Sequence, residues 1–252
     1  MTLRTFRIGQ IVPSSNTTME TEIPAMLRAR EDVEPERFTF HSSRMRMKQV
    51  TKEELAAMDA DSERCAAELT DARVDVIGYA CLVAIMSAGR GYHCESERRL
   101  REVTKREGAE VPVVTSAGAL IHGLKTLGAK RIALIAPYVR PLTNLVCDYI
   151  RYEGFDVADS VALEIPDNVK VGRRDPMALV GIYKQLNLDG VDTLVLSSCV
   201  QMPSLAAIPV VEREVGLPIV SAAVCTTYQM LQKLGLRTYV PDAGALLSGK
   251  YS

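Results

Sequence analysis

Two cysteines occupy the same setting in this sequence. Cys81 and Cys199 each follow a short apolar run, residues 75–80 and 192–198, of the kind that forms a buried β-strand, and each precedes residues that can start a helix. A thiol at such a turn lies near the helix N-terminus, whose partial positive charge favours thiolate over thiol. Two facing thiols could act on opposite sides of one substrate carbon, one as nucleophile or base and the other as proton donor.

Polar groups follow other predicted strands. Asn16 and Tyr138 each stand just after one, and Asn168 ends a further β-rich stretch. Ligands of open α/β sheets bind beyond the carboxyl ends of the strands, so these side chains are candidates for holding a substrate. Backbone N–H groups after the two cysteines could hold a carboxylate in the same cleft. Those residues are Leu82, Val83, Val200 and Gln201.

Each candidate also has a purely structural interpretation. A cysteine after a buried strand is often a core residue, and Asn16 could serve only as a helix cap. Tyr138 and Asn168 could be ordinary turn residues. The symmetric placement of Cys81 and Cys199 argues against core packing for that pair. The other cysteines fall within or near the starts of predicted helices and are expected to be structural; they are Cys65, Cys94, Cys147 and Cys225.

Composition excludes several classes of function. The net charge is -1, from 30 basic and 31 acidic residues, so no electrostatic footprint for nucleic acid or an anionic membrane is present. No apolar run reaches the roughly 18–20 residues of a membrane span, and the start lacks the features of a signal peptide. We therefore expect a cytoplasmic protein. The cysteines form no CxxC pair and the three histidines do not cluster with carboxylates, so we expect free thiols and no metal site.

The elements that must position these groups alternate between strand and helix, which predicts an α/β fold with doubly wound parallel sheets. Expected strands lie at residues 6–12, 37–41, 75–80, 111–115, 131–136, 157–163, 192–198 and 217–221. Expected helices lie at residues 19–30, 51–72, 86–91, 96–108, 141–153, 177–187, 208–215 and 226–233, with another ending at 127.

Three landmarks recur in the same order. Residues 8–13 match 132–137, the Cys81 strand matches the Cys199 strand, and VPVVTSA at 111–117 matches LPIVSAA at 217–223. Chance could supply one such match, but three in order are typical of an internal repeat. We therefore expect two pseudo-symmetric α/β lobes whose strand ends face each other across an active-site cleft.

Several segments carry a resemblance to a known family. The chain resembles the aspartate/glutamate racemase superfamily and, within it, the maleate cis-trans isomerases, over essentially its whole length. The matching segments are IVPSSNTTME at 11–20, RFTFHSSRMRMKQVTKEELAAMD at 37–59, GYACLVAIM at 78–86, SCVQMPS at 198–204 and DAGALLSG at 242–249.

The resemblance implies specific roles. Cys81 would be the nucleophile and Cys199 its acid/base partner, while Asn16, Tyr138 and Asn168 match the family's substrate-holding positions. The implied reaction is cofactor-independent isomerisation of maleate to fumarate, by thiolate addition, bond rotation and elimination. The resemblance also suggests a homodimer or higher oligomer, a role in nicotinate breakdown, and a lobe swap in which residues 222–252 complete a first lobe of 1–116, leaving 117–221 as the second.

Alternative functions stay open at this point. An aspartate or glutamate racemase would use the same two thiols to exchange an α-proton. Arylmalonate decarboxylation is less favoured, because the resemblance there implies one active cysteine and this chain has two. A binding protein whose paired thiols sense oxidants is a candidate from another class. The sequence also does not choose between a succinyl adduct and an enediolate as the intermediate of isomerisation.

Overall fold

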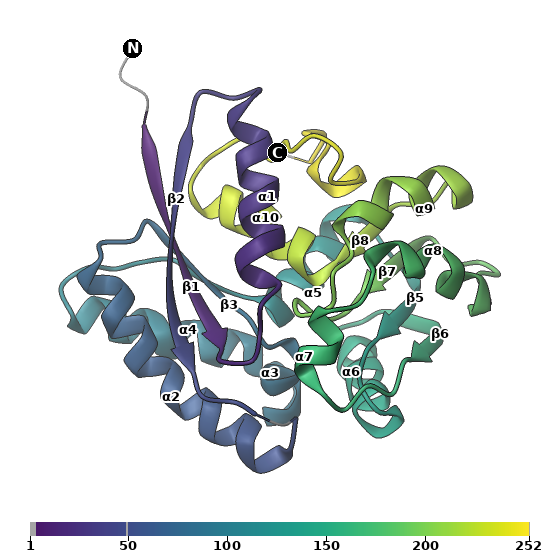
Figure 1. The fold of residues 1–252 in the computed structure, drawn as a ribbon, viewed down its shortest axis with the longest axis horizontal. Coiled ribbons are helices and arrows are strands. Elements are labelled where there is room, and N and C mark those ends of the chain that lie inside the picture. The colour runs from purple at the N-terminus through teal and green to yellow at the C-terminus, as the bar shows by residue number, and fades with distance from the viewer. Residues whose placement is uncertain (1–3, 49, 252) are drawn as a thin grey trace.

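Two four-stranded parallel sheets form the framework of the molecule (Figure 1). The computed structural model describes residues 4–48 and 50–251; residues 1–3, 49 and 252, which belong to the predicted first lobe, lie outside the described residues. The strand order is β2-β1-β3-β4 in the first sheet and β6-β5-β7-β8 in the second. The two sheets therefore have the same order, which confirms the predicted pair of related α/β lobes.

The first sheet brings two predicted site turns together. Because both of its faces are covered, β1 and β3 are nearly continuous apolar runs. The register pairs Ile11 with Tyr79, and the Ala80 N–H donates to the Ile11 carbonyl at 3.0 Å. The turns that follow β1 and β3 thus leave the sheet at one edge. The strands are β1 (Thr5–Pro13), β2 (Arg37–Met45), β3 (Val76–Tyr79) and β4 (Val113–Thr115).

The second sheet repeats this arrangement. The Ser198 N–H donates to the Ile135 carbonyl at 3.0 Å, so the turn after β7 lies beside the turn after β5. The Cys199 and Tyr138 turns are consequently neighbours, as the Cys81 and Asn16 turns are in the first sheet. The strands are β5 (Arg131–Ala136), β6 (Asp156–Ala162), β7 (Thr193–Ser197) and β8 (Ile219–Ser221).

Helices cover both faces of each sheet (Figure 1). On the first sheet, α2 packs on β1 and β2 and also contacts α3 and α4. α1 packs on β1 and β2, whereas α10 packs on β3 and β4. The chain thus returns to the first sheet after crossing the second, although the predicted lobe boundaries stay a prediction. The longer helices are α1 (Met19–Glu31), α2 (Lys52–Asp71), α4 (Tyr92–Arg106), α5 (Ser116–Leu127), α6 (Arg140–Tyr152), α9 (Ile208–Val215) and α10 (Ala222–Lys233).

The repeat also explains how equivalent helices begin. Thr115 accepts a hydrogen bond from the Gly118 N–H at the start of α5, and Ser221 accepts one from the Val224 N–H at the start of α10. A hydroxyl at this position satisfies a backbone donor that has no partner within the helix. α5 and α10 pack against each other. No helix among the described residues is long and apolar enough to cross a membrane.

Several local expectations differ from the structure, three of them in ways that change an element or lie at the predicted site. The predicted helix at 177–187 is wrong as a single element, because Pro176 and Gly181 favour short turns. Those turns are η1 (Pro176–Ala178), α8 (Leu179–Ile182) and η2 (Tyr183–Gln185). α3 (Leu82–Ala88) begins immediately after Cys81, four residues before the expected start, and α7 (Asn168–Gly172) occupies what was expected to be a loop. Both of these differences lie at the predicted site.

Two further 3-10 turns complete the fold: η3 (Leu205–Ala207) precedes α9, and η4 (Ala245–Leu247) lies in the C-terminal segment. This segment, yellow in Figure 1, runs back beside α1. The buried Arg30 of α1 donates to the carbonyls of Arg237 and Tyr239 at 2.7 and 2.8 Å. These bonds fix the last part of the chain to the first lobe.

Candidate active site

A small enclosed cavity lies where the strand ends of the two sheets meet. Its volume is about 20 Å³, room for roughly one water molecule. Residues that follow β1, β3, β5 and β7 all contribute to its wall, together with α7 and the segment after β2. The lining residues are Pro13, Asn16, Met47, Val50, Cys81, Val83, Tyr138, Asn168, Cys199, Val200 and Gln201.

Almost all of the predicted site residues meet at this cavity. Both Cys81 and Cys199 line it, so the two symmetric thiols face one space. Leu82, which was expected to contribute its backbone N–H, is the one predicted residue that is not among the lining residues. All six cysteines are free. The remaining cysteines do not contribute to the wall, as expected.

Cys81 has an unusual backbone conformation. Its φ of +99° and ψ of +71° place it in the left-handed region, where a side chain other than glycine is disfavoured. The cause is topological, because β3 ends at Tyr79 and α3 begins at Leu82, leaving two residues to turn the chain. The Ala84 N–H in the first turn of α3 donates to the Cys81 sulfur. The turn thus presents this sulfur to the cavity at a cost in backbone strain.

Cys199 lies opposite in a different hydrogen-bonding environment. The N–H groups of Gln201 and Met202 and the Tyr138 hydroxyl all reach its sulfur. The same hydroxyl lies 3.3 Å from the Ser198 carbonyl oxygen, to which it can donate. Burial raises the pKa of Tyr138 well above its ordinary value, and both cysteines add to this, so the phenol stays protonated and remains a donor.

Both thiols are protonated in the closed site. Burial raises the pKa of Cys81 to about 12, with Cys199 and Asp59 adding to the rise and the Ala84 N–H opposing it. Burial also raises the pKa of Cys199, against the opposing effect of Tyr138 and two backbone N–H groups. A Cys81 thiolate therefore forms only when its proton passes to another group. The expected stabilisation of thiolate by the turn is present but is outweighed by burial.

A paired carboxylate lies behind the Cys81 turn. Asp59 of α2 accepts hydrogen bonds from the hydroxyls of Tyr79 and Tyr92, at 3.0 and 2.6 Å, and from Arg99 at 2.8 Å. Tyr79 is fully buried and stands two residues before Cys81. This network anchors the end of β3 to α2 and α4, so the strained turn is built on a fixed base.

Asn16 and Asn168 are both tied to backbone or side-chain partners. The Asn16 side-chain oxygen accepts from the N–H groups of Thr18 and Met19, each at 3.0 Å, so the residue does cap α1. Its amide nitrogen is left as the group that can face a ligand. Asn168, the first residue of α7, donates from its side-chain nitrogen to the Ser15 hydroxyl at 2.9 Å.

Among the residues that the structure describes, no cationic side chain lines the cavity. A bound carboxylate would therefore rely on N–H and O–H donors, namely the backbone after the two cysteines, the asparagine amides and the Tyr138 phenol. No group of three or more histidine, cysteine, aspartate or glutamate side chains that could hold a metal ion occurs within residues 4–48 and 50–251.

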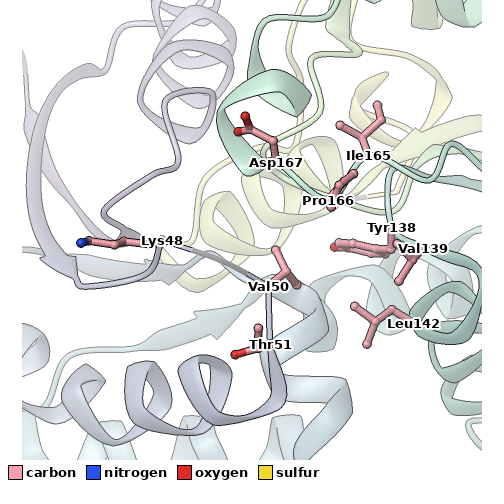
Figure 2. Close-up of a pocket in the computed structure, with 9 residues that line it drawn as sticks. All are labelled: Lys48, Val50, Thr51, Tyr138, Val139, Leu142, Ile165, Pro166 and Asp167. Atoms are coloured by element: carbon pink, nitrogen blue, oxygen red, sulfur yellow. The ribbon is translucent and has the colours of Figure 1, made fainter.

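A larger outer cavity, of about 520 Å³, adjoins the small one (Figure 2). Val50 and Tyr138 line both cavities. Figure 2 shows the Tyr138 ring extended toward Val50, whereas the Lys48 amine points away from the other lining residues. Val50 and Tyr138 therefore lie where the two cavities meet.

Four lining residues were not anticipated from the sequence. Pro13 was expected only to end the first strand, and Met47 and Val50 lie in a basic connection between predicted elements, where nothing in the local pattern marks them. The Gln201 side chain was also missed, although its backbone N–H was considered. Its signal was a polar residue within an otherwise apolar turn, two positions after Cys199.

Comparison with known proteins gives consistent matches over nearly the whole chain. A family model described as arylmalonate decarboxylase matches residues 8–247. A maleate isomerase from Pseudomonas putida is 65% identical over 246 residues, which cover 98% of each chain. A crystal structure of a maleate isomerase from Pseudomonas putida S16 with maleate is 63% identical, with a TM-score of 0.97, and the match covers 98% of this chain and 99% of that one.

A second solved structure is informative about chemistry. It is a Nocardia farcinica maleate cis-trans isomerase mutant, with serine in place of a cysteine and a covalently bound succinylcysteine intermediate. It is 46% identical to this chain, with a TM-score of 0.93, and the match covers 96% of this chain and 98% of that one. The similarity thus includes proteins in which a cysteine forms a covalent bond to the substrate carbon skeleton.

Proposed function

The chain belongs to the maleate isomerase family, within the wider family that the arylmalonate decarboxylase model describes, and we propose that it isomerises maleate to fumarate through Cys81 and Cys199. One observation supports this assignment of residues more than any other. Two thiols from equivalent strand ends of two related lobes line one enclosed cavity. Such an arrangement allows one sulfur to attack an alkene carbon while the other exchanges a proton at its neighbour.

Isomerisation begins with addition. The Cys81 sulfur forms a bond to one alkene carbon, and the electrons of the double bond move to the adjacent carbon. Cys199 gives its thiol proton to that carbon, and the proton released by Cys81 restores the Cys199 thiol. The product of this step is a succinyl adduct on Cys81. This order agrees with two thiols that are both protonated before reaction.

Rotation and elimination complete the reaction. The former double bond is now a single bond, about which the adduct rotates. Cys199 then passes its thiol proton to the departing Cys81 sulfur and takes a proton from the carbon that it had protonated, so the trans double bond forms and both thiols are restored. Enclosure of the cavity keeps water away from the adduct during these steps.

The substrate carboxylates are held without a cationic side chain. We assign this role to the backbone N–H groups of Val83 and Val200 and to the side chains of Asn16, Tyr138 and Asn168. Donors fixed before the reaction stabilise the charge that develops on a carboxylate when the sulfur adds. The backbone N–H group of Leu82 was expected to share this role, and that assignment stays a prediction.

The proposal is tested by incubating the purified protein with maleate and measuring fumarate by NMR. Wild-type protein is expected to form fumarate, and Cys81→Ala is expected to form none while keeping the far-UV circular dichroism of the wild type. Full activity of Cys81→Ala would overturn the assignment of the nucleophile. Incubation with L-aspartate or L-glutamate in deuterated water tests the racemase alternative, and no α-proton exchange is expected.

The assembly and location of the protein are also proposals. The family resemblance suggests a homodimer or larger oligomer, which size-exclusion chromatography with light scattering measures directly. The cytoplasmic location expected from the sequence stays a prediction, as does a role in nicotinate breakdown.

A further inference from the structure

The Gln201 side chain makes an unusual set of contacts. It is 2% exposed and lies two residues after Cys199 in the turn that follows β7. Its amide oxygen accepts from the N–H groups of Thr17 and Thr18, at 2.8 and 3.2 Å. Its amide nitrogen donates to the carbonyls of Ser15 and Asn168, at 3.1 and 2.7 Å. The oxygen and the nitrogen of this one amide are therefore each engaged in two hydrogen bonds, all of them with backbone groups.

The partners belong to the two segments that carry the asparagines. Ser15 and Thr17 flank Asn16 in the turn after β1, and the fourth partner is Asn168 itself. One amide thus joins the turn after β1 in the first lobe, α7 in the second, and the turn that carries Cys199. The Thr18 hydroxyl adds a bond to the Gln201 carbonyl at 2.8 Å.

We propose that Gln201 is a positioning residue of the isomerase, which fixes Asn16 and Asn168 relative to Cys199. The inference rests on the proposed function, because it assigns those three residues to substrate binding and proton transfer. Gln201 acts through them: its amide is occupied by the protein backbone and so is not free to bind the substrate.

The packing of α7 supports this role. A Cβ added to Gly172 would lie 2.5 Å from the Gln201 side-chain nitrogen and 2.9 Å from the Thr17 hydroxyl oxygen. The backbone of Gly172 is not in the left-handed region. Glycine is therefore favoured here because a larger side chain would clash with the Gln201 amide, and not because of its backbone dihedral angles. The end of α7 is therefore shaped around the amide.

The chemistry of the contacts calls for an amide. Gln201→Glu keeps the length of the side chain and the two acceptor bonds. Its carboxylate cannot donate, and it would face the carbonyl oxygens of Ser15 and Asn168, which repel it. The change should release α7 and its asparagine while leaving the rest of the turn in place.

The test is a double-mutant cycle on the full-length enzyme, measured as kcat/KM for maleate. Gln201→Glu is expected to lower kcat/KM at least tenfold in the wild-type background. Asn168→Ala removes the positioned side chain but keeps the carbonyl that Gln201 contacts. In that background the same Gln201 change is expected to lower kcat/KM less than threefold. An equal loss in both backgrounds would show a general structural role and would overturn the proposal.

A matched control comes from a second contact between the lobes. Glu22 of α1 accepts from the N–H groups of Ser204 and Leu205, both at 2.6 Å, and touches neither asparagine. Glu22→Ala is expected to lower the melting temperature but to change kcat/KM less than threefold. A tenfold loss of kcat/KM in Glu22→Ala would overturn the specific role of Gln201.

A milder variant covers the case in which Gln201→Glu fails to fold. Gly172→Ala keeps the amide but pushes it away from α7, and it is expected to lower kcat/KM at least threefold with a native circular dichroism spectrum. Unchanged kcat/KM would overturn the proposal. Failure of the proposed function is distinguishable, because wild-type protein would then form no fumarate in the same assay.

Discussion

The left-handed backbone of Cys81 leads to a prediction about stability. A residue with a Cβ in this region costs about 1–2 kcal/mol relative to a relaxed conformation. Cys81→Gly and Cys81→Ala both remove the sulfur, so the difference between them isolates the backbone. Glycine loses roughly 0.5–1 kcal/mol more chain entropy on folding than alanine does. The glycine variant is therefore expected to be the more stable of the two, by about 0.5–1 kcal/mol.

Thermal unfolding followed by circular dichroism measures this difference. For a chain of this size, about 1 kcal/mol corresponds to roughly 2–4 °C in Tm, so Cys81→Gly should melt about 1–4 °C above Cys81→Ala. The equivalent pair at Cys199 is the control, because that residue is not in the left-handed region. There the order should reverse, with Cys199→Ala the more stable. A Cys81→Gly variant no more stable than Cys81→Ala would refute the account of strain at the nucleophile.

Three further predictions follow from the contacts of the site. Because the pKa of Cys81 is raised to about 12, its alkylation by iodoacetamide, followed by peptide mass spectrometry, should still rise about tenfold per pH unit between pH 8 and 10; a plateau near pH 8.5 would contradict this. Tyr138→Phe removes the hydroxyl that bonds the Cys199 sulfur and should lower kcat about 10–100-fold, whereas an unchanged kcat would remove the phenol from the mechanism. Burial raises the pKa of Glu22, so the stabilisation that its protonated carboxyl gives to the fold is lost as pH rises above the ordinary carboxyl pKa. The urea midpoint of the wild type should therefore fall relative to that of Glu22→Gln between pH 4 and 7. Parallel curves for the two proteins would exclude this effect.

The site relies on enclosure and not on charge. No lysine, arginine or histidine side chain of the described part of the chain lines the inner cavity, and burial favours the neutral form of both thiols. A dicarboxylate entering this space brings the only net charge, so backbone N–H groups and the amides carry the binding. The cavity of about 20 Å³ is too small for such a molecule, so binding requires the site to widen.

Much of this framework was predictable from the sequence. Strands buried on both faces are largely apolar runs, and the internal repeat in the sequence predicts Cys81 and Cys199 at equivalent strand ends. Parallel strands bring such ends to one edge of a sheet, which explains why Asn16 and Tyr138 were also placed near the thiols. Asn168 came mainly from the family resemblance, since a single asparagine in a loop carries little information.

Other features depend on tertiary contacts that leave no periodic pattern. The positive φ of Cys81 follows from the short connection between β3 and α3. The sequence did not predict it, because the helix was expected to start four residues later than it does. Val50 lines the cavity because the segment after β2 folds over the strand ends. The Gln201 side chain is hydrogen-bonded to Asn168 and Thr17, which lie about 30 and 180 positions before it in the sequence. Local sequence patterns do not reveal such distant pairs.

The central claim is that the Cys81 sulfur forms a bond to the substrate while Cys199 moves the proton. Cys199→Ser should slow proton exchange and let the adduct accumulate. Intact mass spectrometry of Cys199→Ser incubated with maleate is expected to show a gain equal to one maleic acid, located on the peptide that contains Cys81 and absent in Cys81→Ala/Cys199→Ser. A gain located on another peptide, or one that persists in the double variant, would contradict the account.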